Sequence, residues 1–254
     1  MKNLCLLVLA ALLGMAAAQP SSRIVGGEDA YEGQFPHQIS LRRSGSHTCG
    51  GSIICNKYVL TAAHCVTYED EDGKYHPLEA SLYTIRAGSI NRLMGGVIKQ
   101  VVEIIVHENY GNFLNDVALL KLENPLVFSA NIAPIPLASQ ETPVGSPVGI
   151  SGWGRLKTNG DIPIKLQYNT LESISKLKCF TSILMSSDTL ICLAHPAGNG
   201  ACNGDSGGPA TYNGELVGVA GFVVGGCGTS NPDGYAKVFY HVEWIKKHAD
   251  CSVL

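Results

Sequence analysis

The chain has 254 residues, of which 45% are hydrophobic and 15% are charged, with 18 basic against 21 acidic side chains. This balance is typical of a globular protein and argues against a disordered chain or a basic protein that coats nucleic acid. The 29 glycines and 12 prolines exclude a bundle of long helices, because they favour short strands joined by tight turns. We therefore expect an all-β protein.

The first segment predicts a secretory signal peptide over residues 1–18. Lys2 precedes an apolar run from Leu4 to Ala18, and the small residues at its end offer a signal-peptidase site before Gln19. A membrane anchor is the alternative, but this run is shorter than the roughly 20 residues that span a bilayer. We expect a secreted, extracellular protein without a membrane partner.

Cysteine usage agrees with export. Apart from Cys5 in the expected signal peptide, the chain has an even set of cysteines, which predicts disulfides in an oxidising compartment. They are Cys49, Cys55, Cys65, Cys179, Cys192, Cys202, Cys227 and Cys251. A zinc site is the competing reading, but none of the spacings is C-x-x-C. We expect no metal.

Short apolar or alternating runs between turn signals predict strands, with no amphipathic helix between them. This pattern favours antiparallel barrels or sandwiches. The runs are Gln38–Arg42, Gly51–Ile54, Tyr83–Ala87, Val97–Val106, Val117–Leu122, Val148–Gly152, Lys165–Leu171, Glu215–Phe222 and Tyr235–Val238.

Two other segments organise the chain. The stretch Asn131–Pro147 contains four prolines, which block regular hydrogen bonding and indicate a connector between two halves of similar size. Near the end, Val242, Ile245 and Ala249 recur at helical spacing. They predict a one-sided helix over about 240–249.

The strongest chemical signal is the run Gly204-Asp205-Ser206-Gly207-Gly208-Pro209. Glycines on both sides of a serine allow a tight turn that exposes the hydroxyl and directs neighbouring N–H groups to one point, as an acyl-transfer nucleophile requires. A glycine-rich hairpin is the alternative without chemistry. The run also matches the G-x-S-x-G elbow of α/β-hydrolases, so it predicts a nucleophile better than a fold.

A serine nucleophile needs a base and a carboxylate that orients the base. His64 lies among small residues beside a cysteine, and Asp116 begins an apolar strand. Either residue alone is weak evidence. The chain order His64, Asp116, Ser206 excludes the α/β-hydrolase reading, in which the serine comes first.

Together these motifs resemble those of secreted serine proteases of the trypsin and chymotrypsin family. The resemblance runs from about Ile24 to the terminal helix, through five motifs in the correct order: Ile24-Val25-Gly26-Gly27, Thr61-Ala62-Ala63-His64-Cys65, Asp116-Val117-Ala118-Leu119-Leu120, Gly152-Trp153-Gly154 and Gly204 to Pro209. It implies a protease domain over residues 24–254, built from two packed six-stranded antiparallel β-barrels at about 35–130 and 131–238 and a C-terminal helix.

The resemblance also implies the roles of the site residues. Ser206 would attack a peptide carbonyl, His64 would take and return the proton, and Asp116 would hold the imidazole. The N–H groups of Gly204 and Ser206 would form the oxyanion hole, and no cofactor is required. The substrates would be proteins or peptides. A catalytically inactive homologue that acts as a binding protein and a secreted esterase are the alternatives.

An activation step follows from the same resemblance. Residues 19–23 would form a propeptide, and a trypsin-like protease would cut after Arg23 to free the α-amine of Ile24. That amine would pair with the buried carboxylate of Asp205 and complete the oxyanion hole. We expect a monomer, with protein inhibitors as a further class of partner.

The family's disulfides correspond to three cysteine pairs here. These pairs are Cys49 with Cys65, Cys179 with Cys192, and Cys202 with Cys227. Cys55 and Cys251 are left over, and they could pair if the terminal helix packs on the first barrel. Ser89 stands where calcium-binding relatives have a glutamate, so the resemblance implies no calcium site.

Specificity is the ambiguous part of the resemblance. Relatives that cut after Lys or Arg have an aspartate six residues before the nucleophile, where this chain has Gly200. Val223 falls where an open pocket has glycine, as in elastases, and Asp233 falls on the opposite wall, as in collagen-cleaving proteases of crustaceans. Because Val223 would obstruct a long side chain, we expect a small or medium aliphatic residue on the amino side of the cleaved bond (P1).

Further departures surround the cleft. Gly221 and Phe222 occupy positions where relatives usually have Ser and Trp. The acidic run Glu69-Asp70-Glu71-Asp72 lies in a loop that is longer than in most relatives. A solvated loop tip is the simpler reading of such a run, and a rim that attracts basic substrate segments is the functional one.

Overall fold

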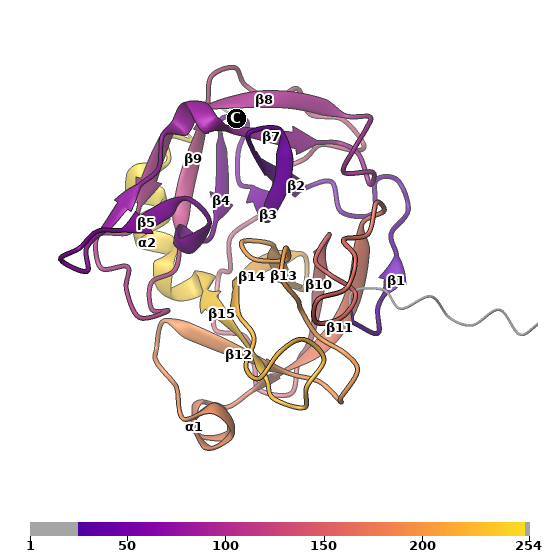
Figure 1. Ribbon diagram of the computed structural model, residues 1–254, viewed down its shortest axis with the longest axis vertical. Coiled ribbons are helices and arrows are strands. Elements are labelled where there is room, and N and C mark those ends of the chain that lie inside the picture. The colour runs from indigo at the N-terminus through magenta and orange to yellow at the C-terminus, as the bar shows by residue number, and fades with distance from the viewer. Residues whose placement is uncertain (1–24, 252–254) are drawn as a thin grey trace, which may run out of the picture.

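The computed structural model describes residues 25–251, which form two closed six-stranded antiparallel β-barrels with short helices (Figure 1). This confirms the all-β, two-barrel, chymotrypsin-like fold with its C-terminal helix. The expected signal peptide and propeptide, with Arg23 and Ile24, lie outside the described residues. Within the described range, no helix is long and apolar enough to cross a membrane.

The first barrel has the strand order β2-β3-β4-β9-β8-β7 and is closed by pairing of β7 with β2. Its strands are β2 (Gln38–Arg43), β3 (Ser46–Ile53), β4 (Tyr58–Thr61), β7 (Tyr83–Ala87), β8 (Val97–Val106) and β9 (Ala118–Leu122). Between β4 and β7 lie the short helix η1 (Ala63–Cys65), the hairpin of β5 (Thr67–Glu69) and β6 (Tyr75–Pro77), and η2 (Ala80–Leu82).

The second barrel has the order β11-β10-β13-β14-β15-β12 and is closed by pairing of β11 with β12. Its strands are β10 (Pro147–Gly152), β11 (Gln167–Ile174), β12 (Leu190–Ala194), β13 (Pro209–Tyr212), β14 (Glu215–Phe222) and β15 (Asp233–Lys237). The short strand β1 (Glu28–Asp29) pairs with the first two residues of β11. Helix α2 (Val238–His248) directly follows β15, near the range expected for it.

A second helix was not expected from the sequence. Helix α1 (Lys176–Ile183) lies between β11 and β12, so the expectation of no helix between strands is wrong at this point. The hydroxyl of Ser175 accepts a hydrogen bond from the backbone N–H of Lys178 and caps the first turn, and Leu184 ends the helix in a left-handed conformation. Only Cys179 of this helix is buried, which explains why no apolar periodicity predicted it.

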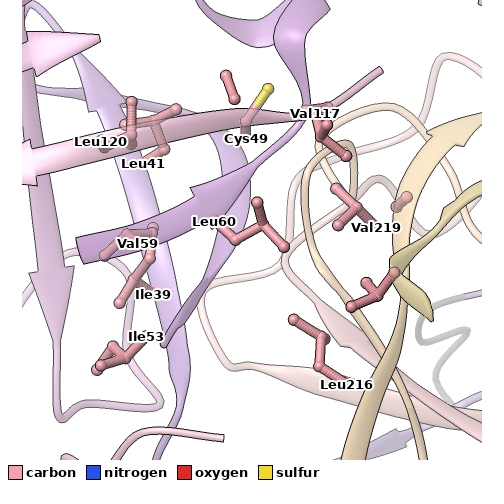
Figure 2. Close-up of a cluster of buried hydrophobic side chains, with 14 of the residues drawn as sticks. Ile39, Leu41, Cys49, Ile53, Val59, Leu60, Val117, Leu120, Leu216 and Val219 are labelled. Carbon is pink, nitrogen blue, oxygen red and sulfur yellow. The ribbon is translucent and has the colours of Figure 1, made fainter. Parts of the chain in front are cut away.

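The main core is a buried apolar cluster that extends through both barrels, and a separate small cluster contains Ala30, Trp153 and Leu166. Alternate residues of β2, including Ile39 and Leu41, point into the first barrel, as the period of a strand requires. In Figure 2, Leu216 and Val219 of β14 extend toward the side of the first barrel that carries Leu60. The two barrels therefore share their apolar interior rather than meeting as separate domains.

Four disulfides brace this core. The three pairs implied by the family resemblance are present, and Cys55 is joined to Cys251 at a sequence separation of 196 residues. The last bond ties the segment after α2 to the turn between β3 and β4, so the end of the chain is attached to the first barrel. Helix α2, in yellow, lies behind the first barrel in Figure 1.

We predict that the Cys55–Cys251 disulfide contributes more to stability than the Cys179–Cys192 disulfide, because it closes a much longer loop in the unfolded chain. The chain-entropy relation gives about 5 kcal/mol for the first and about 3 kcal/mol for the second. Denaturant unfolding of C55A/C251A and C179A/C192A should show the larger loss in the first variant. An equal or smaller loss in C55A/C251A would contradict this ranking.

Candidate active site

His64 and Asp116 form a close pair in the first barrel. His64 lies on η1 just after β4, and Asp116 precedes β9, the neighbour of β4 in the barrel. The backbone N–H of His64 donates to Asp116 Oδ1 at 2.9 Å, and its Nδ1 lies 2.7 Å from Asp116 Oδ2. The carboxylate side chain is almost fully buried, whereas the imidazole is one-third exposed. Asp116 therefore fixes the Nδ1 side of the His64 ring, while part of the ring stays exposed to solvent.

The pKa of His64 reflects this environment. Burial disfavours the imidazolium, but the hydrogen bond and the negative charge of Asp116 outweigh burial and raise the pKa above its usual value of 6.5. The bond at Nδ1 also leaves Nε2 as the open ring nitrogen. This arrangement suits a group that gains a proton during a reaction and returns it.

Ser206 lies in a loop of the second barrel that is anchored to both barrels. Its carbonyl oxygen accepts a 2.7 Å hydrogen bond from Gly50 N–H of β3, and the next residue, Gly207, donates to the Ala220 carbonyl of β14. A Cβ on Gly207 would lie 2.2 Å from Thr61 Oγ1, just before η1. The serine is thus held against the segment that leads into His64.

The structure places His64, Asp116 and Ser206 at the junction of the barrels, but they do not form a continuous chain of hydrogen bonds. No hydrogen bond joins the Ser206 hydroxyl to His64, whose Nε2 lies 3.7 Å from Cys65 Sγ. Catalytic hydrogen bonds of this kind are often long before substrate binds. The cysteine sulfurs near His64 belong to the Cys49–Cys65 disulfide, so this group offers no thiolate for a metal.

The N–H groups of Gly204 and Ser206 donate no hydrogen bond to any residue in the range 25–251. Gly204 has φ +103°, a conformation that L side chains rarely adopt, and a Cβ there would lie 3.2 Å from Gly154 Cα. Two free N–H groups flanking one residue form a site for a developing negative charge. The role of these two N–H groups as oxyanion donors stays a prediction.

His47 stabilises the same loop and was not singled out by the sequence. Its Nε2 lies 3.1 Å from the carbonyl oxygen of Gly204, and its Nδ1 lies 2.8 Å from the Ser40 hydroxyl. Burial lowers the pKa of His47 to about 4, so the ring is neutral near pH 7 and can donate from Nε2 to the carbonyl. A histidine on a strand carries no sequence signal for this role.

Asp205 is buried at the interior side of the nucleophile loop. Its carboxylate accepts hydrogen bonds from the backbone N–H groups of Gly154 at 2.7 Å and Cys202 at 2.9 Å. Burial raises the pKa of Asp205 to about 7 despite these two bonds, and the negative charge of Asp233 adds to the increase. Among residues 25–251 no cationic side chain pairs with it, so backbone N–H groups are its partners there.

A pocket with a volume of about 240 Å³ opens beside Ser206. It is lined by Ala201, Cys202, Asn203, Ser206, Ala220, Gly221, Phe222, Val223, Gly234 and Tyr235. Val223 is among the residues that line this pocket. A Cβ on Gly221 would lie 3.7 Å from Asp116 Oδ2, and the ring of Phe222 lies 5.4 Å from that of Phe113. Gly221 thus lies between the pocket and the carboxylate of Asp116.

Gly200 and Asp233 lie behind this lining. Asp233 does not stand free on a wall: its Oδ2 accepts a 2.7 Å hydrogen bond from Ala201 N–H, and its Oδ1 lies 3.3 Å from His195 Nε2. The side chains of His195 and Asp233 are 2% and 5% exposed. The sequence did not single out His195, because no motif or period links it to Asp233.

The acidic run forms the tip of the β5–β6 hairpin. Asp70 accepts hydrogen bonds from the backbone N–H groups of Asp72 and Lys74, and its Oδ2 lies 2.6 Å from His76 Nε2. The hydrogen bond from Lys74 and the contact with His76 lower the pKa of Asp70. One acid of the run therefore stabilises the hairpin, while Glu69, Glu71 and Asp72 are exposed to solvent.

We predict that Gly200→Ala destabilises the protein more than Gly198→Ala does. Both glycines have a positive φ, but a Cβ at Gly200 would lie 2.5 Å from His195 Nε2 and 2.8 Å from Asp233 Oδ2, whereas a Cβ at Gly198 meets nothing within 4 Å. Backbone strain costs about 1–2 kcal/mol in either variant, and the clash adds to it only at Gly200. Thermal unfolding of both variants checks this, and equal losses would contradict it.

Comparison with known proteins agrees with the geometry. Residues 24–245 match the trypsin protein family. The chain is 48% identical to serine protease SP24D of Anopheles gambiae over 236 residues, which cover 92% of this chain and 84% of that protein. It is 40% identical to trypsin delta of Drosophila erecta over 239 residues, which cover 91% and 90% of the two chains. The chain is a member of the trypsin family and a serine endopeptidase.

Proposed function

We propose that the chain is the secreted zymogen of an endopeptidase whose activated form works through an acyl-enzyme on Ser206. The observation that carries this proposal is the pairing of the buried Asp116 with Nδ1 of His64, whose imidazole is one-third exposed. A carboxylate on Nδ1 selects the tautomer that can accept a proton at Nε2.

The proposed reaction has two halves. Ser206 Oγ attacks the carbonyl carbon of the scissile bond, its proton moves to His64 Nε2, and the carbonyl oxygen becomes an oxyanion that accepts hydrogen bonds from Gly204 and Ser206 N–H. Collapse of the intermediate breaks the C–N bond, and His64 gives the proton to the leaving amine. Water then repeats these steps on the ester and restores the Ser206 hydroxyl.

We predict that a fluorophosphonate probe labels Ser206 in the activated protein, and that Asp116→Asn lowers kcat/KM by about ten-thousand-fold, because the wrong imidazole tautomer then faces the serine. In the unsubstituted enzyme kcat/KM should fall as the pH drops through the pKa of His64, above 6.5, since the base must be neutral. These assays use casein and a matched peptide series.

The same assays separate the alternatives. An inactive homologue that acts as a binding protein would not be labelled. An esterase would be labelled and would hydrolyse esters but not casein. Either result would contradict the proposed endopeptidase mechanism.

The proposed activation step supplies the cation that Asp205 lacks among the described side chains. Cleavage after Arg23 by a trypsin-like protease would free the α-amine of Ile24, and a buried carboxylate with a raised pKa gains most from an ammonium partner. Residues 19–23 would be the propeptide that withholds this amine, after removal of a signal peptide at residues 1–18. We propose that the secreted protein is a monomer and that protein inhibitors are among its partners.

We predict that Arg23→Gln gives a folded chain without proteolytic activity after treatment with trypsin. In this uncleaved form, the raised pKa of Asp205 means that its folded state holds a proton more tightly than its unfolded state. Its contribution to stability is therefore greatest below pH 3.8 and decreases as the pH rises to about 7.

The control variant R23Q/D205N removes that titration. As the pH rises from 4 to 7, R23Q should lose unfolding free energy relative to R23Q/D205N. Above pH 7 the difference between the two variants should stay constant. Denaturant unfolding across this range measures the difference. Full activity of R23Q, or a difference independent of pH, would contradict the proposed role of Asp205.

We further propose that the activated enzyme prefers a small or medium aliphatic P1 residue over Lys or Arg. Gly200 provides no carboxylate at the base of the pocket, and Val223 occupies part of its lining. Branched side chains in such a position leave little room for a long basic residue. The exposed acids of the β5–β6 hairpin would favour basic segments elsewhere in the substrate, with a range limited by salt to about 8–10 Å.

We predict that kcat/KM for matched peptides is higher with Ala or Leu at P1 than with Phe or Arg. Val223→Gly should widen the pocket and raise kcat/KM for Phe by about tenfold, or roughly 1.4 kcal/mol of transition-state binding, with little change for Ala. An Arg peptide preferred by more than about tenfold in the unsubstituted enzyme would show that Asp233 dominates and would overturn this order.

A further inference from the structure

We propose that His195 is a specificity-determining residue, and that its ion pair with Asp233 sets the net charge beneath the substrate pocket and with it the acceptance of a basic P1 side chain. This inference rests on the proposed protease function of the pocket. It assigns the discrimination between charged and uncharged P1 residues to a histidine that does not line the pocket itself.

The pair occupies the space directly behind the pocket lining. A Cβ on Gly200 would lie 2.5 Å from His195 Nε2 and 2.8 Å from Asp233 Oδ2, so the imidazole and the carboxylate fill the volume that a side chain at Gly200 would need. Ala201, which lines the pocket, donates its N–H to Asp233, and the lining residue Gly234 follows Asp233 in the chain. Only one layer of backbone separates the pair from a bound side chain.

The contacts of the ring favour the imidazolium. Nδ1 of His195 lies 3.2 Å from the Pro196 carbonyl oxygen, and Nε2 lies 3.3 Å from Asp233 Oδ1. Each neutral tautomer has a hydrogen on one nitrogen only, so it would turn a lone pair toward one of these two oxygens. The protonated ring keeps the contact of Nδ1 with the Pro196 carbonyl and places a positive charge beside the carboxylate of Asp233. Nε2 has no hydrogen-bond partner among residues 25–251, so its stabilisation comes from the charge of Asp233.

The protonation of His195 is set by opposing effects. Burial disfavours the imidazolium, but the carboxylate of Asp233 and the Pro196 carbonyl outweigh burial and raise the pKa above 6.5. The other titratable neighbours are Asp205 on the nucleophile loop and Tyr235 on β15, whose pKa values are both raised by burial and further by the charge of Asp233. Tyr235 stays neutral at physiological pH, and the Ile24 amine would compensate Asp205 after activation.

The charge of the pair therefore changes with pH. Below the pKa of His195 the imidazolium and the carboxylate cancel, and a basic P1 side chain meets no net charge. Above it the neutral imidazole leaves one buried negative charge, which attracts Lys or Arg through a medium of low dielectric constant. The ion pair thus explains how Asp233 can lie beneath the pocket without giving the enzyme a preference for basic P1 residues at every pH.

The test is the ratio of kcat/KM for a P1 Arg peptide to that for the matched P1 Leu peptide, measured from pH 6 to pH 9.5. The titration of His64 affects both peptides alike and cancels in the ratio, whereas the titrations of Asp205 and the Ile24 amine are shared by the wild type and the His195 variant and cancel between them. We expect the ratio to rise roughly tenfold over this range in the activated wild-type enzyme. His195→Gln should show a high ratio already at pH 6 and little change above it.

His76→Gln is the matched control, because it removes an exposed histidine that also pairs with an aspartate, Asp70. Its ratio should follow the wild type. Asp233→Asn should give a low ratio at every pH, and together with the wild-type titration it decides the question if H195Q does not fold. A wild-type ratio that changes less than twofold, or a rise retained in H195Q, would overturn the inference. Failure to cleave either peptide would instead contradict the proposed function, and this inference would fall with it.

Discussion

The site depends on the close approach of the two barrels at a few glycines. Gly50 of β3 donates its N–H to the carbonyl of Ser206 at 2.7 Å, and a Cβ on Gly50 would lie 2.8 Å from Gly208 Cα. Any side chain at Gly50 or Gly207 would push the barrels apart, because the atoms that it would meet are mostly backbone. His64 and Ser206 come from different barrels, so their relative position depends on this contact. The hydrogen bond between Ser151 Oγ and Gln38 Oε1, at 2.7 Å, supports the same junction.

Three buried carboxylates organise the chemistry around that junction, and each is compensated differently. Asp116 is held by the backbone and ring of His64, Asp205 by backbone N–H groups, and Asp233 by Ala201 N–H and the ring of His195. A buried charge is tolerated only when hydrogen bonds or an opposite charge replace water. The partner of each carboxylate matches its proposed role. Asp116 has a permanent partner in the catalytic base, and Asp205 would gain its partner by proteolysis during activation. Asp233 has a partner, His195, whose charge changes with pH and would set specificity.

The loops show why a family fold leaves specificity open. The β5–β6 hairpin, Phe222 and Val223 lie on segments that connect or end strands, and of these only Val223 packs against the shared apolar core. Asp70 illustrates that a run of acids is not a single surface, because its carboxylate is used within the hairpin while its neighbours face solvent. Substrate preference is therefore decided by local contacts that the barrel packing does not constrain.

The sequence by itself determined the family, the fold class and the candidate nucleophile, base and orienting acid, because short motifs and their order along the chain carry that information. Strands β2 and β8 were predicted as apolar or alternating runs, whereas β4 and β12, which are almost entirely buried and have no alternating pattern, were not. The tertiary structure decided the partners of residues far apart in sequence. Cys55 meets Cys251 only because α2 returns to the first barrel, and His195 meets Asp233 only because β12 and β15 are adjacent in the second. Such pairs depend on strand order and close packing, which local sequence does not encode.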